Sequence, residues 1–208
     1  MQLLIDYSSL LYRAYHSNPD SIPMHGVHGF LNMLARVVQD RRPDRLALCT
    51  DDDWRPEFRT REIPEYKAHR VGDEPDPVGP HEAFGREVLQ ALGLAVVGWP
   101  GYEAEDLIAT LAARSAEPVE VLSGDRDLFA LVEDPRVKVL YPMKGVSQLA
   151  EVDEGEITRR YGIPGRTYGD FALLRGDPSD GLPGVPGIGE KTAARLINDY
   201  GSLDALLR

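Results

Sequence analysis

Five short apolar runs alternate with segments of helical period in the N-terminal part of the chain. Each run has the length of a short buried strand. The runs are Leu3–Ile5, Leu46–Cys49, Leu94–Val97, Val119–Leu122 and Val137–Leu140. The segments of helical period are Val27–Val38, His81–Leu92, Glu103–Ala113 and Arg126–Val132. Strands that alternate with helices require crossover connections, which give a parallel sheet covered on both faces. The sequence therefore predicts an α/β fold with a mostly parallel central sheet flanked by helices.

Aspartates stand at the ends of three of these predicted strands. Asp6 closes the first run, Asp51 follows the second with Asp52 directly beside it, and Asp125 and Asp127 follow the fourth. A single aspartate at such a place is more often a helix or turn cap. Ligands of parallel sheets bind beyond the carboxyl ends of the strands, however, and capping explains three such strands poorly. We expect these side chains to form one acidic site.

A second acidic group lies in the stretch GYEAED. Glu103 and Asp106 are three residues apart and project from one side of a helix. Glu105 is about 100° round from Asp106, so it either reaches the site or faces solvent. Acids also occur in a first helical turn simply because they suit the helix dipole. For each of these three acids, a site role and a purely structural role both remain open at this point.

The stretch Leu173–Tyr200 joins two further features. Asp177 and Asp180 are carboxylates three residues apart, and a glycine-rich turn directly after them opens a helix with Lys191 and Thr192. Glycines at a helix start let the backbone approach a phosphate, which the N–H groups and the helix dipole attract. The turn is not a Walker A loop, because GIGEKT lacks a glycine directly before the lysine and no strand leads into it. An acidic pair beside a phosphate-binding turn indicates an enzyme that acts on a nucleic-acid backbone.

The ligand chemistry of these acids indicates hard cations. Carboxylates without histidine favour Mg²⁺ or Mn²⁺, and the five scattered histidines show no spacing for zinc. Asp125 and Asp127 are separated by one residue and can bridge two ions, with Asp125 shared. Two ions roughly 3.5–4 Å apart stabilise both the attacking and the leaving oxygen of a displacement at phosphorus. The net charge of −11 argues against a general nucleic-acid coat protein but is compatible with acids concentrated in a metal site.

Strands stop and helices take over from about residue 151. We therefore expect a core over residues 1–150 and a smaller helical subdomain over 151–208. Its predicted helices are Glu154–Tyr161, Tyr168–Leu174, Glu190–Tyr200 and Leu203–Leu207. Within the core, Arg70–Pro80 has three prolines, two glycines and three acids, and is predicted to be a loop.

Several features bear on the compartment. The one cysteine, Cys49, lies in an apolar run, so it indicates a buried strand thiol and no intrachain disulfide. The first residues lack the basic segment of a signal peptide, and no apolar stretch approaches the ~18 residues of a membrane span. We expect a soluble cytoplasmic protein.

Taken in order, these motifs resemble those of the 5′-nuclease family. The family includes the N-terminal domains of bacterial family A DNA polymerases, stand-alone bacterial homologues and the eukaryotic flap endonucleases. The resemblance covers essentially the whole chain and implies a PIN-like 5′-nuclease fold with a C-terminal helix-turn-helix, or helix-hairpin-helix, subdomain that binds DNA. No polymerase module follows, so the chain is expected to be a stand-alone homologue or an isolated domain. The matching elements are Asp6, a strand-end Asp, Phe58–Arg59, YKAHR at Tyr66–Arg70, GYEAED, SGDRDL and GDPSDGLPGVPGIGEKTA.

The resemblance also implies roles for individual residues. Lys67 and Arg70 of YKAHR would contact the scissile phosphate, where a cation offsets charge that develops in the transition state. The turn over 184–189 often binds K⁺ in the family, here through the main-chain carbonyls of Val185 and Ile188. One metal site would be formed by Asp6, Asp51, Glu103, Glu105, Asp106 and Asp125, and the second by Asp125, Asp127, Asp177 and Asp180. The other expected DNA contacts are Arg13, Arg59, Tyr66, Gly187, Gly189, Lys191 and Thr192.

The chain departs from the family pattern at several positions. Glu105 stands where bacterial members usually have Asp, as it does in eukaryotic flap endonucleases, so we expect metal binding to be kept. Gly181 replaces the usual Asn and is expected to loosen its loop. The spacing between Asp51 and Phe58 is one residue longer than in the family pattern, so Asp52 competes with Asp51 as the strand-end acid. The family's arch over the active site is commonly basic and helical, whereas Val71–Pro80 is acidic and proline-rich. Threading of the 5′ single strand is therefore expected to differ.

The resemblance implies a Mg²⁺- or Mn²⁺-dependent, structure-selective 5′ nuclease. Such a flap endonuclease or 5′-3′ exonuclease hydrolyses DNA phosphodiesters near single-strand/duplex junctions in replication and repair. The expected substrate is DNA with a 5′ flap, a nick or a 5′ end, including RNA-primed ends, and the expected enzyme is a monomer without a membrane partner. Two alternatives remain: a metal-dependent small-molecule phosphohydrolase, which would not need the glycine-rich turn, and a non-catalytic DNA-binding module, which would not need nine acids.

Overall fold

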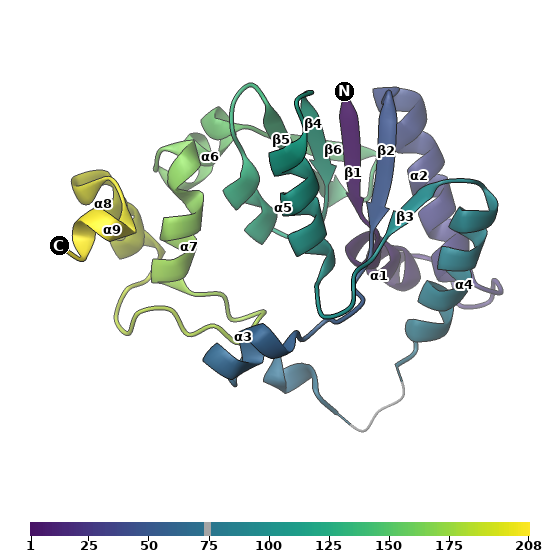
Figure 1. Ribbon diagram of the computed structural model, residues 1–208, viewed down its shortest axis with the longest axis horizontal. Coiled ribbons are helices and arrows are strands. Elements are labelled where there is room, and N and C mark those ends of the chain that lie inside the picture. The colour runs from purple at the N-terminus through teal and green to yellow at the C-terminus, as the bar shows by residue number, and fades with distance from the viewer. Residues whose placement is uncertain (73–75) are drawn as a thin grey trace.

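A sheet of six strands forms the centre of the molecule, and it is mostly parallel, as the sequence predicts (Figure 1). The computed structural model describes residues 1–72 and 76–208. The strand order is β3-β2-β1-β4-β5-β6; β1 to β5 are parallel, and β6 pairs antiparallel with β5. The bounds are β1 Gln2–Asp6, β2 Arg45–Cys49, β3 Ala95–Val97, β4 Val119–Leu122, β5 Val137–Lys144 and β6 Gln148–Val152.

Helices cover both faces of this sheet, as Figure 1 shows. One face packs against α1 (Tyr7–Ser17), α2 (His25–Arg41) and α4 (Gly79–Ala91). The other face packs against α5 (Ala104–Arg114), the 3-10 helix η2 (Asp127–Leu131), α6 (Glu154–Tyr161), α7 (Tyr168–Arg175) and α8 (Glu190–Tyr200). The remaining helices are α3 (Glu57–Glu62), η1 (Ala68–Arg70), η3 (Gly165–Thr167) and α9 (Leu203–Leu206). Within the described parts of the chain, no helix is long and apolar enough to cross a membrane.

The two faces explain why β1 carries consecutive apolar residues. Leu3 and Ile5 of β1 pack in the core under α1, α2 and α4, whereas Leu4 between them packs in the core on the opposite face. Successive side chains of a strand point to opposite faces, and both faces are buried here. An alternating polar pattern would place polar groups in one of the two cores.

Several elements differ from the sequence prediction, and α3 is one that was not predicted. Helix α1 was not predicted, although its buried residues Tyr7, Leu10, Leu11 and Ala14 follow helical spacing. Strand β6 was also not predicted, because it is a short edge strand in which only Val152 is fully buried. The predicted helix over 126–132 is a five-residue 3-10 helix.

The C-terminal helices share a core with the sheet. Tyr168 and Phe171 of α7 are fully buried, and the ring of Tyr168 lies 5.4 Å from that of Phe129 in η2. Ala193 and Ile197 of α8 belong to the same cluster. Aromatic packing of this kind ties the helical part of residues 151–208 firmly to the sheet.

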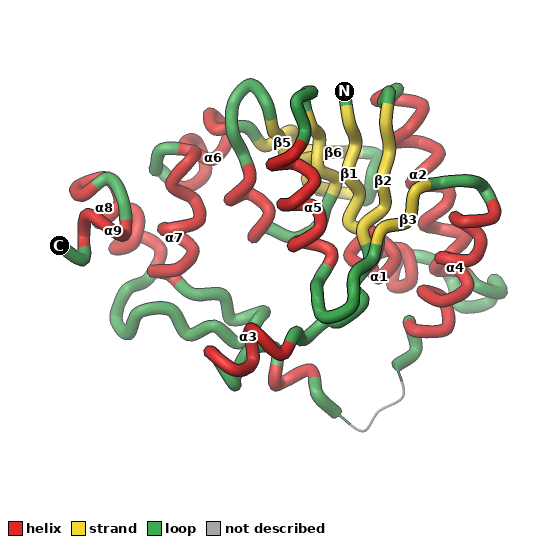
Figure 2. Tube along the Cα trace, in the orientation of Figure 1, coloured by secondary structure: helices red, strands yellow, loops and turns green. Residues whose placement is uncertain are grey.

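Strands β1, β2 and β4 end at the same level. Ile5 pairs with Leu48 of β2 and with Leu122 of β4, and Asp6 pairs with Cys49. The strand order reverses beside β1, which is the place where parallel sheets bind ligands. Loops gather at this edge, and α3, which follows β2 in the chain, lies beyond it (Figure 2). Of the predicted loop Arg70–Pro80, Arg70 ends η1 and α4 begins at Gly79, while residues 73–75 lie outside the described residues.

We predict that Arg41→Ala destabilises the fold by about 3 kcal/mol, because it leaves the carboxylate of Glu120 buried without its main partner. The Glu120 side chain is only 6% exposed and accepts two hydrogen bonds from Arg41, one of them 2.8 Å from Nε. Lys138 is farther away, with Nζ 3.8 Å from the carboxylate. Urea unfolding measures the free-energy change.

The matched control is Arg36→Ala on the same helix. Arg36 pairs with Asp40 at 2.7 Å, but both side chains are more than half exposed. Exposed pairs contribute little, so this change should cost less than about 0.5 kcal/mol. Equal losses in the two variants would contradict a structural role for the buried pair.

Candidate active site at the carboxyl edge of the sheet

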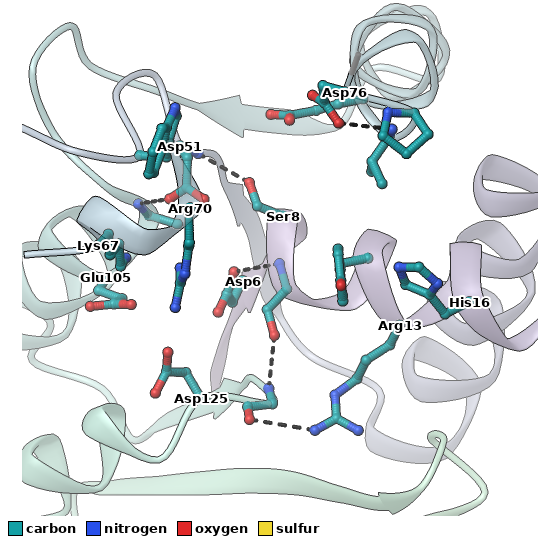
Figure 3. A pocket seen from close by; sticks show the side chains of 18 of the residues that line it. Asp6, Ser8, Arg13, His16, Asp51, Lys67, Arg70, Asp76, Glu105 and Asp125 are labelled. Carbon is teal, nitrogen blue, oxygen red and sulfur yellow. Dashed lines mark hydrogen bonds between the residues drawn. The ribbon is translucent and has the colours of Figure 1, made fainter. Parts of the chain in front are cut away.

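A cavity of about 1300 Å³ lies at the carboxyl edge of the sheet. Figure 3 shows its carboxylates and cations from close by. Four predicted acids line it: Asp6, Asp51, Glu105 and Asp125. They come from the ends of β1, β2 and β4 and from the first turn of α5, which are far apart in the sequence. The tertiary structure thus brings the strand-end acids Asp6, Asp51 and Asp125 to one cavity together with Glu105, whereas Asp127, which the strand-end pattern also predicts, does not line it.

Asp6 is the most enclosed acid of the cavity. It is only 4% exposed, and its carboxylate accepts hydrogen bonds from the Ser9 amide at 3.0 Å and from the Ser123 hydroxyl at 2.5 Å. Burial raises the pKa of Asp6 to about 7, and the nearby charge of Asp51 adds to this rise. The side chain has a capping role for α1 and a position in the cavity at the same time.

The structure separates Asp51 from Asp52. Asp51 lines the cavity, and its carboxylate accepts a hydrogen bond of 2.7 Å from the Ala104 amide at the start of α5. The carboxylate of Asp52 instead accepts a hydrogen bond of 2.6 Å from Arg86 on α4, and Asp52 does not line the cavity. Of the two competing aspartates, Asp51 therefore has the position that the acidic site requires.

Glu105 reaches the cavity, which decides a question that the helical spacing left open. Burial and the nearby Asp125 raise its pKa well above the ordinary value for a glutamate. In Figure 3 the side chains of Glu105, Asp6 and Asp125 face a common space, and Arg70 extends into it. Carboxylates that repel one another in this way are an arrangement that a cation stabilises.

Asp127 and Asp177 form a second acidic region next to the cavity. The amide of Asp127 donates to the carboxylate of Asp125 at 2.9 Å. Burial raises the pKa of Asp127 to about 7, with further contributions from the charges of Asp125, Asp177 and Asp180. The carboxylate of Asp177 accepts a hydrogen bond from the Ser179 amide at 2.7 Å. These acids are close enough to influence one another electrostatically.

Three of the predicted acids are paired with cations. Glu103 is 1% exposed and accepts hydrogen bonds from the Tyr66 hydroxyl at 2.8 Å and from the Lys67 ammonium. Asp106 forms a bidentate pair with Arg59 at 2.8 and 2.9 Å. Asp180 pairs with Arg70 at 2.6 Å and lies 3.7 Å from Lys67 Nζ. These three acids therefore differ from Asp6, Asp51, Glu105 and Asp125, which line the cavity.

The donor set fits divalent metal ions that prefer oxygen. The four predicted acids at the cavity offer carboxylate oxygens, which are the donor atoms that hard ions such as Mg²⁺ and Mn²⁺ bind. In residues 1–72 and 76–208, no three side chains of Asp, Glu, His or Cys lie close enough together to form a ready-made ligand cluster. Ion binding would therefore draw the carboxylates of the cavity closer to one another.

The segment with Lys67 and Arg70 is attached to the loop with Asp177 and Asp180. The Lys67 amide donates to the main-chain carbonyl of Asp180 at 2.8 Å, and Arg70 donates to the carbonyl of Ser179 at 2.7 Å. Both cations line the cavity; Lys67 is buried, whereas the Arg70 side chain is 43% exposed. The two segments thus form one unit at the cavity wall.

Gly181 fits closely into this contact. Its φ of +73° favours glycine, and an added Cβ would lie 2.8 Å from the main-chain oxygen of Glu65. We expected the absence of a side chain to loosen the loop. The structure instead shows that it permits the close approach of two backbones.

The other residues predicted to contact DNA differ in accessibility. Arg13 lines the cavity and donates to the Gly124 carbonyl at 3.5 Å. Tyr66 is only 5% exposed, and Arg59 is engaged with Asp106 and with Glu103, 3.2 Å away. Tyr66 and Arg59 therefore hold acids in place in this structure, while Arg13 is directed toward the cavity.

The glycine-rich turn joins α7 to α8 as a helical hairpin. Gly184 has a φ of +65°, and an added Cβ would lie 2.5 Å from the Gly176 amide nitrogen, so the two backbones touch here. The Val185 carbonyl accepts a hydrogen bond of 2.9 Å from the Ile188 amide. Gly189 is the N-cap of α8. Gly187, Gly189 and Lys191 are exposed, and Thr192 is half-buried.

Several residues of the site were not singled out from the sequence. Ser123 holds Asp6, and its hydroxyl also accepts a hydrogen bond of 2.9 Å from the Asp125 amide. Arg86 donates to the main-chain carbonyl of Asp51 at 2.8 Å. Trp54 lines the cavity. A serine directly after a buried strand and before two aspartates was an available signal, whereas the position of Arg86 depends on how α4 packs.

Comparison with known proteins relates the chain to 5′-3′ exonucleases over its whole length. The family model of the 5′-3′ exonuclease N-terminal resolvase-like domain matches residues 1–162, and that of its C-terminal SAM fold matches residues 163–208. The chain is 50% identical to a 5′-3′ exonuclease of Streptomyces coelicolor over 97% of the chain and 72% of the relative. It is 44% identical to a 5′-3′ exonuclease of Mycobacterium tuberculosis, over 99% and 72%. The structure of a bacteriophage T5 flap endonuclease complexed with DNA and metal ions resembles this fold with a TM-score of 0.79, at 18% identity over 99% of this chain and 77% of the other.

We predict that Gly181→Ala destabilises the protein by at least about 1 kcal/mol more than Gly93→Ala, because Gly181 combines a strained φ with a backbone contact. Gly93 has a nearly identical φ of +74°, but an added Cβ there has no neighbour within 4 Å. The control therefore isolates the cost of the backbone angle. Thermal unfolding of both variants measures the difference, and equal midpoints would contradict the close fit at Glu65.

Proposed function

The chain belongs to the 5′-3′ exonuclease family, and on this premise we propose how it acts and on which DNA. As a member of the family, it is a 5′ nuclease that hydrolyses DNA phosphodiesters. We propose that it selects single-strand/duplex junctions, namely 5′ flaps, nicks and 5′ ends, including RNA-primed ends in replication and repair. The observation that carries this proposal is the group of four carboxylates at one cavity beside two cations.

Asp6, Asp51, Glu105 and Asp125 would hold the metal ions, because their carboxylates line the same cavity. Asp127 lies beside Asp125, and Asp177 is close enough to Asp127 to raise its pKa, so both would take part in a second site. When bound, two ions would activate the attacking water and stabilise negative charge at phosphorus. Mg²⁺ and Mn²⁺ are the proposed ions, since the available ligands are carboxylate oxygens.

Glu103, Asp106 and Asp180 have a different part in this proposal. Each is paired with a cation: Glu103 and Asp180 hold Lys67 and Arg70 at the wall of the cavity, whereas Asp106 holds Arg59 outside it. They would join the ligand set only by exchanging those partners for a metal ion. We propose that their main role is to position Lys67, Arg59 and Arg70.

Lys67 and Arg70 would bind the scissile phosphate. Both line the cavity with the four acids, and Arg70 has the more exposed side chain. Their hydrogen bonds to Glu103, Ser179 and Asp180 hold them in place before substrate binds. A positioned cation stabilises the charge that develops on the phosphate oxygens. Arg13, on the α1 side of the cavity, would bind a neighbouring phosphate.

The hairpin of α7 and α8 would bind duplex DNA as part of a DNA-binding subdomain over residues 151–208. Gly187 and Gly189 are exposed, so main-chain N–H groups at the start of α8 are accessible to a phosphate. Lys191 adds a positive charge, and Thr192, the next residue of the helix, would also contact the DNA. Carbonyls of Val185 and Ile188 would bind K⁺. Tyr66 and Arg59 would support the DNA surface indirectly, through Glu103 and Asp106.

Location and assembly complete the proposal. A cytoplasmic location fits a DNA substrate. We also propose that the protein acts as a monomer.

We expect metal-dependent cleavage of a labelled flap duplex and no action on a generic phosphatase substrate. The carboxylates cannot replace the ions as activators of water, so excess EDTA should abolish cleavage, and Mg²⁺ or Mn²⁺ should restore it. Product lengths on flap, nicked and blunt duplexes show which junction is preferred. Cleavage in EDTA, or hydrolysis of the phosphatase substrate alone, would exclude the proposed function.

We further expect Asp51→Asn to lower cleavage more than about 100-fold, since loss of a direct ligand should exceed the effect of losing a group that only orients a ligand. Asp52→Asn is the matched control, because Asp52 faces Arg86 and does not line the cavity. It should retain most of the activity. Titration of each variant with Mn²⁺ shows whether the loss of cleavage comes from weaker metal binding. A larger loss of cleavage in Asp52→Asn would assign the ligand role to Asp52.

A further inference from the structure

Trp54 has an unusual position for a tryptophan. It lies three residues after Asp51 and lines the same cavity as Asp6, Lys67 and Arg70. The residue is 43% exposed. An exposed aromatic side chain at a cavity that also holds acids and cations is available to a ligand. The proposed functions of the acids and cations leave this side chain without a role.

The backbone on both sides of Trp54 is held firmly. The amides of Asp52 and Asp53 donate to the Tyr102 carbonyl at 3.3 and 3.2 Å. The guanidinium of Arg55 donates to the carbonyls of Tyr66 and Pro64 at 2.7 and 2.6 Å. The indole therefore projects from a fixed main chain, and little conformational entropy is lost when a ligand binds to it.

The indole also differs from the aromatic rings near it. Phe58 packs against Tyr102, with centroids 5.6 Å apart, and lies under the guanidinium of Arg59. Tyr12, at the cavity on α1, packs against His16 with centroids 4.4 Å apart. Among the described residues, Trp54 has no comparable ring or cation contact, and at 43% exposure part of the residue is accessible at the cavity.

We propose that Trp54 stacks on an unpaired nucleobase of the cleaved strand, next to the scissile phosphate. This inference rests on the proposed function. Lys67 and Arg70 supply charges for the phosphate, but neither recognises whether the adjacent base is paired. A base within a duplex is already stacked on its neighbours, whereas an unpaired base offers its face to an aromatic side chain. Stacking accepts any base, so Trp54 would select structure without selecting sequence.

The test uses a flap duplex in which one nucleotide at a time around the junction is replaced by an abasic residue. In the wild-type protein, one position should slow single-turnover cleavage about 10-fold, the effect of losing one stacked base. Trp54→Ala should cleave the intact duplex about 10-fold more slowly and lose its sensitivity to that position. Trp54→Phe should keep most of the rate and the sensitivity, since a phenyl ring still stacks.

Trp99→Ala is the matched control. Trp99 is the second tryptophan of the chain and is 63% exposed, but it does not line the cavity. Its variant should keep the wild-type rate and abasic profile. A Trp54→Ala protein that keeps the wild-type abasic profile, or that is slowed equally at every position, would overturn the proposal and indicate a structural role.

A second measurement is independent of cleavage. Trp99→Phe leaves Trp54 as the sole tryptophan, and flap DNA added in EDTA should quench its fluorescence, with less quenching by blunt duplex. Equal or absent quenching with both DNAs would overturn the proposal. Should the wild-type protein cleave none of the DNA substrates, the proposed function would be wrong, and this fluorescence comparison would still decide the role of Trp54.

Discussion

Repulsion among carboxylates is the constraint on which the arrangement of this site depends. Asp6, Asp51, Glu105 and Asp125 share one cavity, and burial together with neighbouring acids raises the pKa of Asp6 and Glu105. Such a group is costly in a fold unless hydrogen bonds or cations compensate for it. The amides of Ser9 and Ala104 and the hydroxyl of Ser123 provide part of that compensation. Divalent ions would provide the rest.

Cations of the chain neutralise a second set of acids around this group. Lys67 and Arg70 pair with Glu103 and Asp180, and main-chain hydrogen bonds fasten their segment to the loop at 177–182. Gly181 allows the two backbones to come together. One contact region therefore positions a phosphate-binding segment and an acidic loop at the same time. This coupling explains how residues 110 positions apart, Arg70 and Asp180, can act in one site.

The sheet and its helices give this site a rigid base. Strands β1, β2 and β4 end at one level, and each is buried on both faces. The helices that carry the glycine-rich turn pack into the same core through Tyr168, Phe171 and Ile197. The proposed duplex-binding turn is thus attached to the sheet that holds the carboxylates. A distance between binding and cleavage can be maintained only if both are fixed to one core.

Local patterns in the sequence determined the positions of β1 to β5, the fold class and the acids at the strand ends, because apolar runs and strand-end aspartates do not depend on distant contacts. The spacing of Tyr7, Leu10, Leu11 and Ala14 would also have predicted α1. Tertiary structure alone decided that Asp51 rather than Asp52 lines the cavity, that Glu105 faces it, and that Arg59 and Tyr66 hold acids. Each of these outcomes depends on which side chain of a distant segment lies opposite, and sequence spacing carries no information about that partner.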